Sequence, residues 1–410
     1  MTRPSVTPRE AAAAAAPAPA VLHPKTRAAH VTVPVPVRGE PLSVPIFQTT
    51  TYAFDDADVI ADAMTRPDAE YTYTRYGNPT VRALETAVAD LEGGVAALAT
   101  SSGMGAINAV LMGLVRTGDH VVAQRCLYGG SYATLTRLQD DFGVEITFVG
   151  GADSEEVRNA LQPHTRLLYL ETIANPMTQV ADIPALAGLA RPAGAITVVD
   201  NTFASPVLCR PMEYGADIVI HSTTKYLGGH SDVTGGIAVF ADDALYRRLW
   251  KRFIELGVTA DPFAAWLTIR GLATLSLRVR QQCENAHYLT SRLADHRAVT
   301  AVHWPGVPDH PSFDLAERLL SDAGGVFSFD LAGGRKAGQE FVGRVRLAKL
   351  AASLGGIETL VLHPASTSHR QLSAVALQEA GIGEGTIRVA VGIEHPADIW
   401  SDFNEALRGL

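Results

Sequence analysis

From about residue 82 to residue 240 the chain alternates between short apolar runs and longer stretches of mixed polarity. The apolar runs are nearly continuous, and the stretches between them are long enough to form helices. Strands that are buried on both faces and joined by helical crossovers are typical of a mostly parallel sheet. The predicted strands cover residues 95–100, 120–123, 144–149, 167–170, 196–199, 218–220 and 236–240, and the first crossover contains a helix through residues 106–115.

A second region follows a helical stretch that runs from about Trp266 to Asp295. Its apolar runs, at residues 299–303, 325–329 and 386–390, are shorter and alternate more with polar residues. Such alternation favours an antiparallel sheet with one face in solvent. The expected fold class is therefore α/β, with a large domain built on a mostly parallel sheet and a smaller C-terminal α+β domain.

Polar residues stand at the ends of several predicted strands of the large sheet. They are Ser101 to Gly103, Glu171, Asp200 with Asn201, and Ser222 with Lys225. In open α/β sheets the ligand binds beyond the carboxyl ends of the strands. These residues are therefore expected to converge on one ligand site.

Residues 218–232 (IVIHSTTKYLGGHSD) place a lysine among hydroxyl groups directly after a buried strand. A lysine ammonium is costly to bury unless it loses its charge or finds a partner. An imine with an aldehyde would remove the charge from Lys225, while Ser222 and Thr224 beside it would hold a phosphate. This combination indicates pyridoxal 5'-phosphate (PLP) as the cofactor. Taken alone, the segment also fits a surface lysine in a polar turn.

Three further positions suit the same cofactor. Asp200 would pair with the protonated pyridine nitrogen, or would alternatively cap the next helix. The backbone N–H groups after Ser102, at Gly103 and Met104, open a helix and would bind the phosphate. Tyr128 would stack on the planar ring, or would alternatively be a core tyrosine at a tight turn.

Two other motifs match only in part. Residues 103–108 resemble a dinucleotide-binding G-x-G-x-x-G loop, but Asn108 replaces the third glycine and no acidic partner follows at the expected distance. Residues 129–133 miss the final glycine of the hydrolase motif G-x-S-x-G. A dinucleotide enzyme and a serine hydrolase are therefore both disfavoured.

Composition excludes several other classes. The 410 residues are 47% hydrophobic and 19% charged, as in ordinary globular proteins. The net charge of −9 disfavours binding to nucleic acid or to an anionic membrane. Cys126, Cys209 and Cys283 are too widely spaced for a zinc motif or a disulfide framework, so no metal site is expected and the cytoplasm is the expected location. No apolar run approaches the roughly 20 residues that span a bilayer.

Taken together, the motifs resemble the Cys/Met-metabolism family of PLP-dependent enzymes, which includes methionine γ-lyase, cystathionine γ-lyase, cystathionine γ-synthase and O-acylhomoserine sulfhydrylase. The resemblance extends from about Thr26 to the C-terminus. It rests on eight ordered segments, at residues 44–52 (VPIFQTTTY), 73–80 (YTRYGNPT), 101–104 (SSGM), 171–176 (ETIANP), 200–202 (DNT), 222–226 (STTKY), 353–356 (SLGG) and 363–367 (HPAST). It implies fold type I and the PLP cofactor.

The resemblance also implies roles for the matching positions around the cofactor. Lys225 is the lysine that forms the imine, Asp200 pairs with the pyridine nitrogen, and Asn175 bonds the ring hydroxylate. Tyr128 stacks on the ring and acts as an acid or base. The phosphate is expected to contact Ser102, Gly103, Met104, Ser222 and Thr224.

Other matching positions imply substrate binding and a shared site. Arg388 and Ser353 are expected to hold the α-carboxylate of an amino-acid substrate, with Thr367 as a further substrate contact. Tyr73 and Arg75 are expected to reach the phosphate of a neighbouring subunit, which implies a homodimer with shared active sites, usually doubled to a homotetramer. From its spacing alone, Arg75 would also fit a solvated surface position.

The expected domain organisation has four parts. Residues 1–25 form a disordered Ala/Pro-rich tail, because alanines broken by prolines do not make a signal peptide. Residues 26–77 form an arm that contacts the neighbouring subunit. Residues 78–275 form the PLP-binding domain, and residues 276–410 form the C-terminal domain.

Departures from the family pattern narrow the expected activity. Cystathionine-specific members carry a glutamate directly before the Ser-Leu-Gly-Gly motif, where this chain has Ala352. A small apolar residue cannot hold the distal ammonium group of cystathionine. Methionine γ-lyases usually have a cysteine where this chain has Gly130, so no member type matches at every position.

The leading hypothesis is PLP-dependent γ-elimination on an L-amino acid with a leaving group at Cγ, as in methionine γ-lyase, giving a 2-oxo acid and ammonia. The alternative is γ-replacement on an O-acylhomoserine. A catalytically silent regulatory protein is a remote alternative, because Lys225, Asp200 and Arg388 are all present.

Overall fold

The computed structural model describes residues 22–31, 41–368, 370, 377 and 381–410. Most of the tail predicted for residues 1–25 lies outside this part of the chain. Its last two residues, Pro24 and Lys25, begin helix α1 (Pro24–Ala29). Proline at the first helical position lacks only an N–H group that the helix would leave unpaired, and His23 Nδ1 accepts the Lys25 N–H at 3.2 Å.

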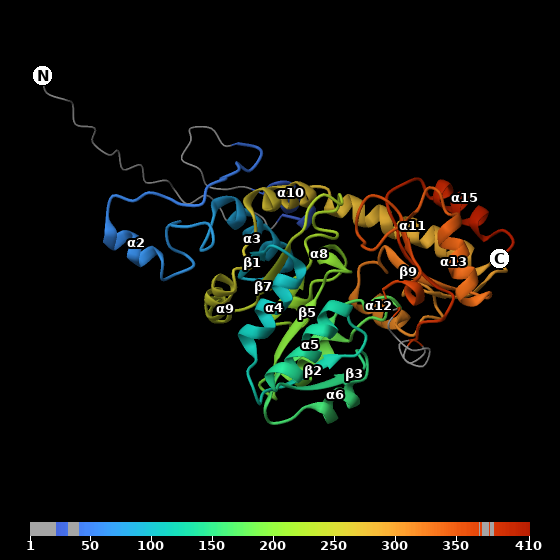
Figure 1. Cartoon of the computed structure of the whole chain (residues 1–410), viewed down its shortest axis with the longest axis horizontal. Coiled ribbons are helices and arrows are strands. Elements are labelled where there is room, and N and C mark those ends of the chain that lie inside the picture. Colours follow the sequence, from blue (N-terminus) through green and yellow to red (C-terminus); the bar gives the residue numbers. More distant parts are fainter. Residues whose placement is uncertain (1–21, 32–40, 369, 371–376, 378–380) are drawn as a thin grey trace, which may run out of the picture.

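The segment between α1 and the large sheet contains helix α2 (Ala57–Ala63) and a bridge between Thr51 and Tyr73. Figure 1 places α2 at the end of the molecule opposite the second sheet. Residues 32–40 of the predicted arm lie outside the described residues. At Phe47 this segment contacts helix α3 (Pro79–Glu92), because the Phe47 N–H donates to Thr80 Oγ1 at 2.9 Å.

The large sheet is mostly parallel, as predicted. Its seven strands follow the order β1-β7-β6-β5-β4-β2-β3, and β7 runs antiparallel to both of its neighbours. The strands lie within a few residues of their predicted positions. They are β1 (Ala96–Thr100), β2 (His120–Gln124), β3 (Glu145–Val149), β4 (Thr165–Glu171), β5 (Ile196–Asp200), β6 (Ile218–His221) and β7 (Gly236–Phe240).

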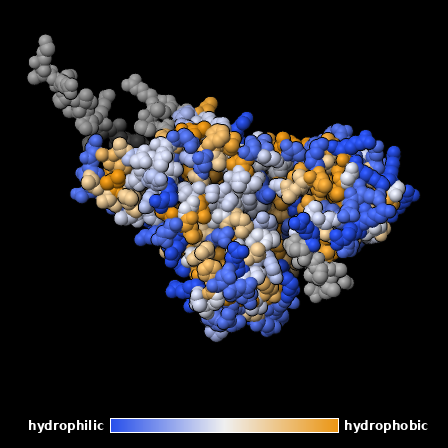
Figure 2. All heavy atoms as spheres, in the orientation of Figure 1, coloured by the Kyte–Doolittle hydropathy of each residue, from blue (hydrophilic) through white to orange (hydrophobic). Residues whose placement is uncertain are grey.

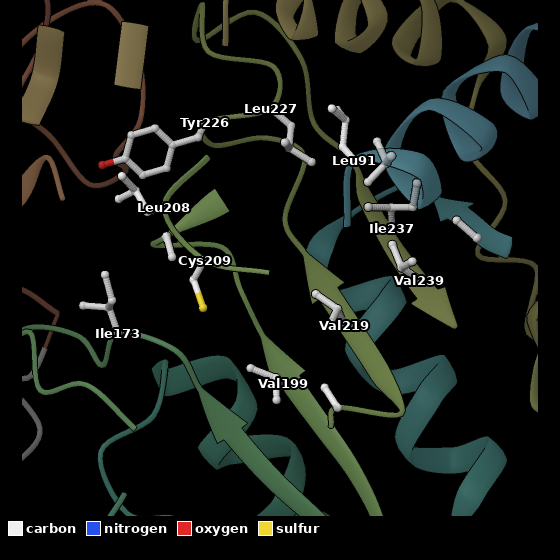
Figure 3. Close-up of a cluster of buried hydrophobic side chains, with 14 of the residues drawn as sticks. Leu91, Ile173, Val199, Leu208, Cys209, Val219, Tyr226, Leu227, Ile237 and Val239 are labelled. Carbon is white, nitrogen blue, oxygen red and sulfur yellow. The ribbon is translucent and has the colours of Figure 1, made fainter. Parts of the chain in front are cut away.

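Both faces of this sheet are buried, which explains why its strands read as continuous apolar runs. In β4, Leu168 and Leu170 belong to the apolar cluster on one face, and Leu167 and Tyr169 belong to the cluster on the other. Figure 3 shows the first cluster, in which Val199, Val219 and Val239 project from three neighbouring strands.

The helices of the large sheet divide between its two faces. Residues of α3 and α7 pack in the first cluster, and residues of α4, α5 and α9 pack in the second. Their bounds are α4 (Gly103–Leu114), α5 (Gly129–Phe142), α6 (Ser154–Ala160), α7 (Ile183–Ala190), α8 (Ser205–Leu208), the 3₁₀ helix η1 (Pro211–Tyr214) and α9 (Asp243–Leu256).

The helical stretch expected from Trp266 to Asp295 is two helices, α10 (Pro262–Leu272) and α11 (Leu275–Ala294). The break is stabilised because the Arg278 guanidinium donates to the Gly271 carbonyl at 2.8 Å, which caps the end of α10. Residues at the start of α11 pack with the large-sheet cluster, and residues near its end pack with the cluster of the second sheet. Helix α11 therefore joins the two cores.

The second sheet has five strands in the order β10-β11-β12-β9-β8. It is antiparallel apart from the β10–β11 pair, which is parallel. It lies beside α13 and α15 in Figure 1, and its apolar face packs on them. The elements are β8 (Val299–His303), α12 (Phe313–Leu319), β9 (Val326–Leu331), α13 (Gly334–Arg344), β10 (Lys349–Leu350), β11 (Leu360–Leu362), the 3₁₀ helix η2 (Pro364–Ser366), β12 (Thr386–Ala390) and α15 (Pro396–Leu407).

This arrangement confirms the predicted fold class, a large α/β unit with a smaller α+β unit. The predicted boundary between residues 275 and 276 falls at the start of α11, the helix that both clusters share. The exact domain bounds therefore stay a prediction.

Candidate active site

A cavity of about 810 Å³ opens at the carboxyl ends of β4, β5 and β6 and reaches residues of the second sheet. Polar strand ends were expected to converge on one site. Glu171, Asp200, Ser222 and Lys225 line this cavity, whereas Ser101 and Asn201 do not. The cavity is lined by eleven of the fourteen site residues predicted from the sequence, namely Ser102, Gly103, Met104, Tyr128, Asn175, Asp200, Ser222, Thr224, Lys225, Ser353 and Arg388. Tyr73, Arg75 and Thr367 do not line it.

Lys225 lies in the turn after β6 and is half-buried. Its Nζ donates a hydrogen bond to Ser353 Oγ at 2.8 Å. Burial lowers the pKa of Lys225, and the nearby Arg388 cation lowers it further. The lysine is therefore biased toward the neutral amine, which is the form that reacts with an aldehyde.

Asp200 ends β5 and is buried. Its Oδ1 accepts the Thr202 N–H at 3.0 Å, and burial raises the pKa of the carboxyl group. No ion pair to Asp200 is formed within the described parts of the chain. A buried carboxylate in this position suits a cationic partner, which the protonated pyridine nitrogen of PLP would supply.

The turn between β1 and α4 forms an anion site. Ser102 caps α4, and its Oγ accepts the Gly105 N–H at 3.0 Å. The first N–H groups of the helix, at Gly103 and Met104, have no partner within it. A Cβ added to Gly103 would lie 2.7 Å from the Cβ of Ser222, so only glycine lets the helix approach β6 this closely.

Ser222 and Thr224, which flank Lys225 in the turn after β6, also line the cavity. The backbone N–H of Ser222 donates to Thr202 Oγ1 at 2.9 Å, and this bond fixes the position of Ser222. The Thr224 hydroxyl donates to the Gly235 carbonyl at 3.2 Å and accepts the Gly235 N–H at 3.0 Å. These groups and the amides of α4 fit a phosphate.

Arg388 reaches the cavity from β12 of the second sheet. Its two Nη atoms donate to the Ser353 carbonyl at 2.8 Å and to Asn175 Oδ1 at 3.2 Å, while the buried Nε has no partner among the described residues. Burial lowers the pKa of Arg388 to about 10. A buried guanidinium bonded to neutral oxygens suits the carboxylate of a substrate.

Tyr128 precedes α5 and its side chain is 49% exposed. Its backbone N–H donates to Glu171 Oε1 at 2.6 Å. Because the ring lines the cavity and is not packed in either core cluster, the alternative of a core tyrosine is not supported.

The three remaining predicted residues lie elsewhere on this chain. The Arg75 guanidinium lies over the rings of Tyr73 and Tyr76, at 5.5 and 5.0 Å from their centres, and Nη1 is 3.4 Å from the Ile254 carbonyl. Thr367 is exposed, and its hydroxyl donates to the His363 carbonyl at 2.8 Å.

Several cavity residues received no role from the sequence. Glu171 was expected at the ligand site from its place at a strand end but was given no role there, and Thr202 stood inside a quoted motif. Met177, Leu362 and Ile382 also line the cavity. They come from distant parts of the chain, and no local pattern marks them.

A lysine that is biased toward its neutral form, a buried carboxylate, a helix N-terminus beside hydroxyl groups and a buried arginine define a PLP-dependent enzyme of fold type I. Lys225, Asp200, the α4 amides and Arg388 are the residues that would hold PLP and its amino-acid substrate. Residues 25–408 match the family described as Cys/Met metabolism PLP-dependent enzyme. The chain belongs to this family.

Relatives of different activity are similarly close to this chain. The L-methionine gamma-lyase of Fusobacterium nucleatum is 41% identical over 374 residues, which cover 90% of this chain and 94% of that protein. The cystathionine gamma-synthase of Mycobacterium bovis is 41% identical over 385 residues, which cover 94% and 96%. A solved cystathionine gamma synthase from Xanthomonas oryzae has a TM-score of 0.89 at 38% identity, covering 95% of this chain and 98% of its own.

Among the described residues, no helix combines the length and the apolar character needed to cross a membrane.

Proposed function

We propose that the protein catalyses γ-elimination on an L-amino acid with a leaving group at Cγ, as methionine γ-lyases do. The observation that carries this proposal is the meeting of Lys225 and Arg388 at Ser353, whose Oγ and carbonyl oxygen they bond respectively. A carboxylate on Arg388 would hold the Cα of an amino acid next to the amine of Lys225. With L-methionine and water, the products would be methanethiol, 2-oxobutanoate and ammonium.

Each residue contributes a distinct step. PLP, when bound, withdraws electrons from the Cα–H bond of the substrate. Lys225, as a neutral amine, would accept the Cα proton. After releasing that proton, the same amine would accept a proton from Cβ, and this second loss lets the bond to the γ-group break, while Asp200 would keep the pyridine nitrogen protonated. The Tyr128 hydroxyl donates a proton to the departing γ-group. Arg388 fixes the carboxylate, so that the Cα proton points at Lys225.

Ala352, Leu354 and Ile382 line the cavity, and we call these three residues its far wall. They favour an uncharged γ-substituent, because none of them can pair with a distal ammonium group. Arg125, also at the cavity, already forms an ion pair with Glu156 at 2.8 Å. These contacts support a thioether or an ester as the leaving group.

γ-Replacement on an O-acylhomoserine is the alternative, because it uses the same residues and because cystathionine γ-synthases are equally similar to this chain. Product analysis separates the two reactions. The purified holoenzyme is incubated with L-methionine or O-acetylhomoserine, with and without cysteine, and 2-oxobutanoate and thioether are quantified. If 2-oxobutanoate forms at the same rate with and without cysteine, the result supports elimination. If thioether forms faster than 2-oxobutanoate when cysteine is present, the result supports replacement.

A single substitution sharpens this test. Ala352→Glu places a carboxylate on the far wall, where it would pair with a distal ammonium. Cystathionine turnover should rise relative to methionine turnover by roughly tenfold or more. An unchanged ratio would show that this wall does not contact the γ-substituent.

We also propose a homodimer with shared sites, doubled to a homotetramer. The support is that Tyr73 and Arg75 do not line the cavity of their own chain. The segment carries exposed apolar side chains, among them Ile46, Val59 and Met64. Figure 2 shows hydrophobic residues at the end of the molecule that carries α2. Exposed apolar side chains at the end of this arm suit contact with a second copy of the chain.

Complementation tests the shared site. Arg75→Ala and Lys225→Ala subunits should each be nearly inactive, and their heterodimer should regain one working site if Arg75 serves the neighbour. Mass measurement confirms that heterodimers form. If heterodimers form and activity does not exceed that of the parents, Arg75 serves its own chain.

A cytoplasmic location is part of the same proposal. The three cysteines are free, and Cys209 and Cys283 are buried, which suits a reducing compartment. Fractionation of cells that produce the protein would test it.

A further inference from the structure

A second buried carboxylate lies beside Asp200 in the cavity wall. Glu171 ends β4, Asp200 ends β5, and the two are paired in register on adjacent parallel strands. Paired positions on adjacent strands place their side chains on the same face, about 5 Å apart at the backbone. Both side chains line the cavity, and Glu171 is only 3% exposed.

The surroundings of Glu171 contain no compensating cation. Oε1 accepts the Tyr128 N–H at 2.6 Å, whereas Oε2 is buried and has no hydrogen-bond partner in the part of the chain that the structure describes. Within the described residues, no lysine, arginine or histidine forms an ion pair with it. The titratable groups that face it are Asp200 on β5, Tyr169 on β4 and Cys126 before Tyr128, and none of them is a cation at neutral pH.

Two adjacent buried carboxylates do not both stay ionised without a cation between them. Asp200 is the better site for the negative charge, because the backbone and side chain of Thr202 bond it and His221 lies near. The bond from the Tyr128 N–H favours the ionised form of Glu171, but burial and the Asp200 charge outweigh it and raise the pKa of Glu171 well above the usual range.

We propose that Glu171 is a neutral carboxylic acid in the working enzyme and acts as a positioning residue. It fixes the turn that carries Tyr128 over the cavity, and its neutrality leaves the negative charge on Asp200. The unpartnered Oε2 is tolerable in this form, since an unpaired neutral oxygen costs far less to bury than an unpaired charge. The inference rests on PLP as the cofactor and is independent of the choice between elimination and replacement.

Glu85 offers a matched control in the same chain. It too is buried, and its Oε1 accepts a backbone N–H, that of Ala99, at 2.9 Å. Its other oxygen lies 3.1 Å from Arg82 Nη1, so this carboxylate has the cation that Glu171 lacks. Glutamine at either position keeps the acceptor and removes any charge.

The direct test is an infrared difference spectrum of the PLP-loaded protein at neutral pH. Wild type minus Glu171→Gln should show the carbonyl band of a protonated carboxylic acid. Wild type minus Glu85→Gln should show carboxylate bands. Carboxylate bands at Glu171 would overturn the proposal, and so would a Glu171→Gln protein that fails to fold.

Two further readouts separate positioning from general stability. Glu171→Gln should leave the pH dependence of the PLP absorbance and the kcat/KM within about threefold of wild type, because charge and acceptor are unchanged. Glu171→Ala should lower kcat/KM by about tenfold or more, because the Tyr128 N–H loses its acceptor. A Glu171→Gln protein whose PLP titration moves by more than about one pH unit would show that a charge had been removed.

Discussion

Arg388 combines deep burial with a guanidinium group that donates to two neutral oxygens. Its planar donors reach Ser353 and Asn175 at once, and a substrate carboxylate would complete the set. The sequence predicted this role through the family resemblance. The sequence did not predict that the same guanidinium also bonds Asn175, because these residues are 213 positions apart and meet only after the second sheet docks on the first.

Arg388→Lys is expected to weaken substrate binding. An ammonium group cannot bond the carboxylate and both protein oxygens in a plane. The transition state should therefore lose about 2 to 3 kcal/mol of stabilisation. This loss corresponds to a decrease in kcat/KM of roughly 30- to 150-fold, mainly through a higher KM. Steady-state kinetics with the best substrate measures this.

Arg278→Lys is the matched control for this prediction. Arg278 is also buried and bonds the carbonyls of Tyr226 and Gly271, but it does not line the cavity. Its substitution should lower the unfolding temperature and leave KM near the wild-type value. An unchanged KM in Arg388→Lys would contradict the assigned role.

At the scale of elements, the apolar pattern located the strands of the large sheet because each strand is buried on both faces. It did not locate the break between α10 and α11. Both helices continue the same apolar period, and the break depends on Arg278 bonding the Gly271 carbonyl from within α11. A single bond from a side chain to a backbone carbonyl leaves no trace in the apolar period.

The contact between α4 and the loop after β6 yields an element-scale prediction. Gly103→Ala should push α4 away from Ser222, because the new Cβ would lie 2.7 Å from the Ser222 Cβ. The anion site would widen, so the PLP dissociation constant should rise by roughly tenfold or more. Fluorescence titration of the apoprotein with PLP measures the change.

Gly188→Ala controls for the glycine substitution itself. Gly188 lies within α7, and a Cβ there would meet no atom within 4 Å. Alanine should leave PLP affinity unchanged and stabilise the helix by up to about 1 kcal/mol. Equal PLP affinity in both variants would show that the α4 contact does not shape the phosphate site.

At the scale of the whole molecule, histidines are buried in both units of the fold. His120 bonds the hydroxyls of Thr165 and Thr147 at 2.8 and 2.9 Å within the large sheet, and His363 bonds Ser366 beside the second sheet. Burial lowers the pKa of both rings. The folded protein therefore resists protonation at these positions more than the unfolded chain does.

This difference predicts a pH dependence of stability. Below the unfolded pKa of about 6.5, the unfolded chain binds a proton at His120 that the folded state binds less well, so stability falls as pH falls. The contribution is at most about 1.4 kcal/mol for each pH unit. Buried carboxyls such as Glu171, whose pKa is raised, contribute with the opposite sign over part of this range.

The His120→Gln variant isolates the histidine contribution from that of the carboxyls. Between about pH 7.5 and pH 5.5, wild type should lose unfolding free energy relative to the variant. Urea unfolding at a series of pH values measures the difference. A constant difference across this range would show that His120 titrates equally in both states.

Ala352 stands on an irregular segment between β10 and β11, whereas Asp200 belongs to the central ladder and Lys225 follows it directly. A change at position 352 would therefore alter what the far wall accepts and leave the strands that carry Asp200 and precede Lys225 in place. Gene duplication followed by drift at such a position would yield lyases and synthases that differ in substrate and share one catalytic apparatus. On this view, relatives with different activities are similarly identical in sequence to this chain because substrate preference diverged faster than catalytic mechanism.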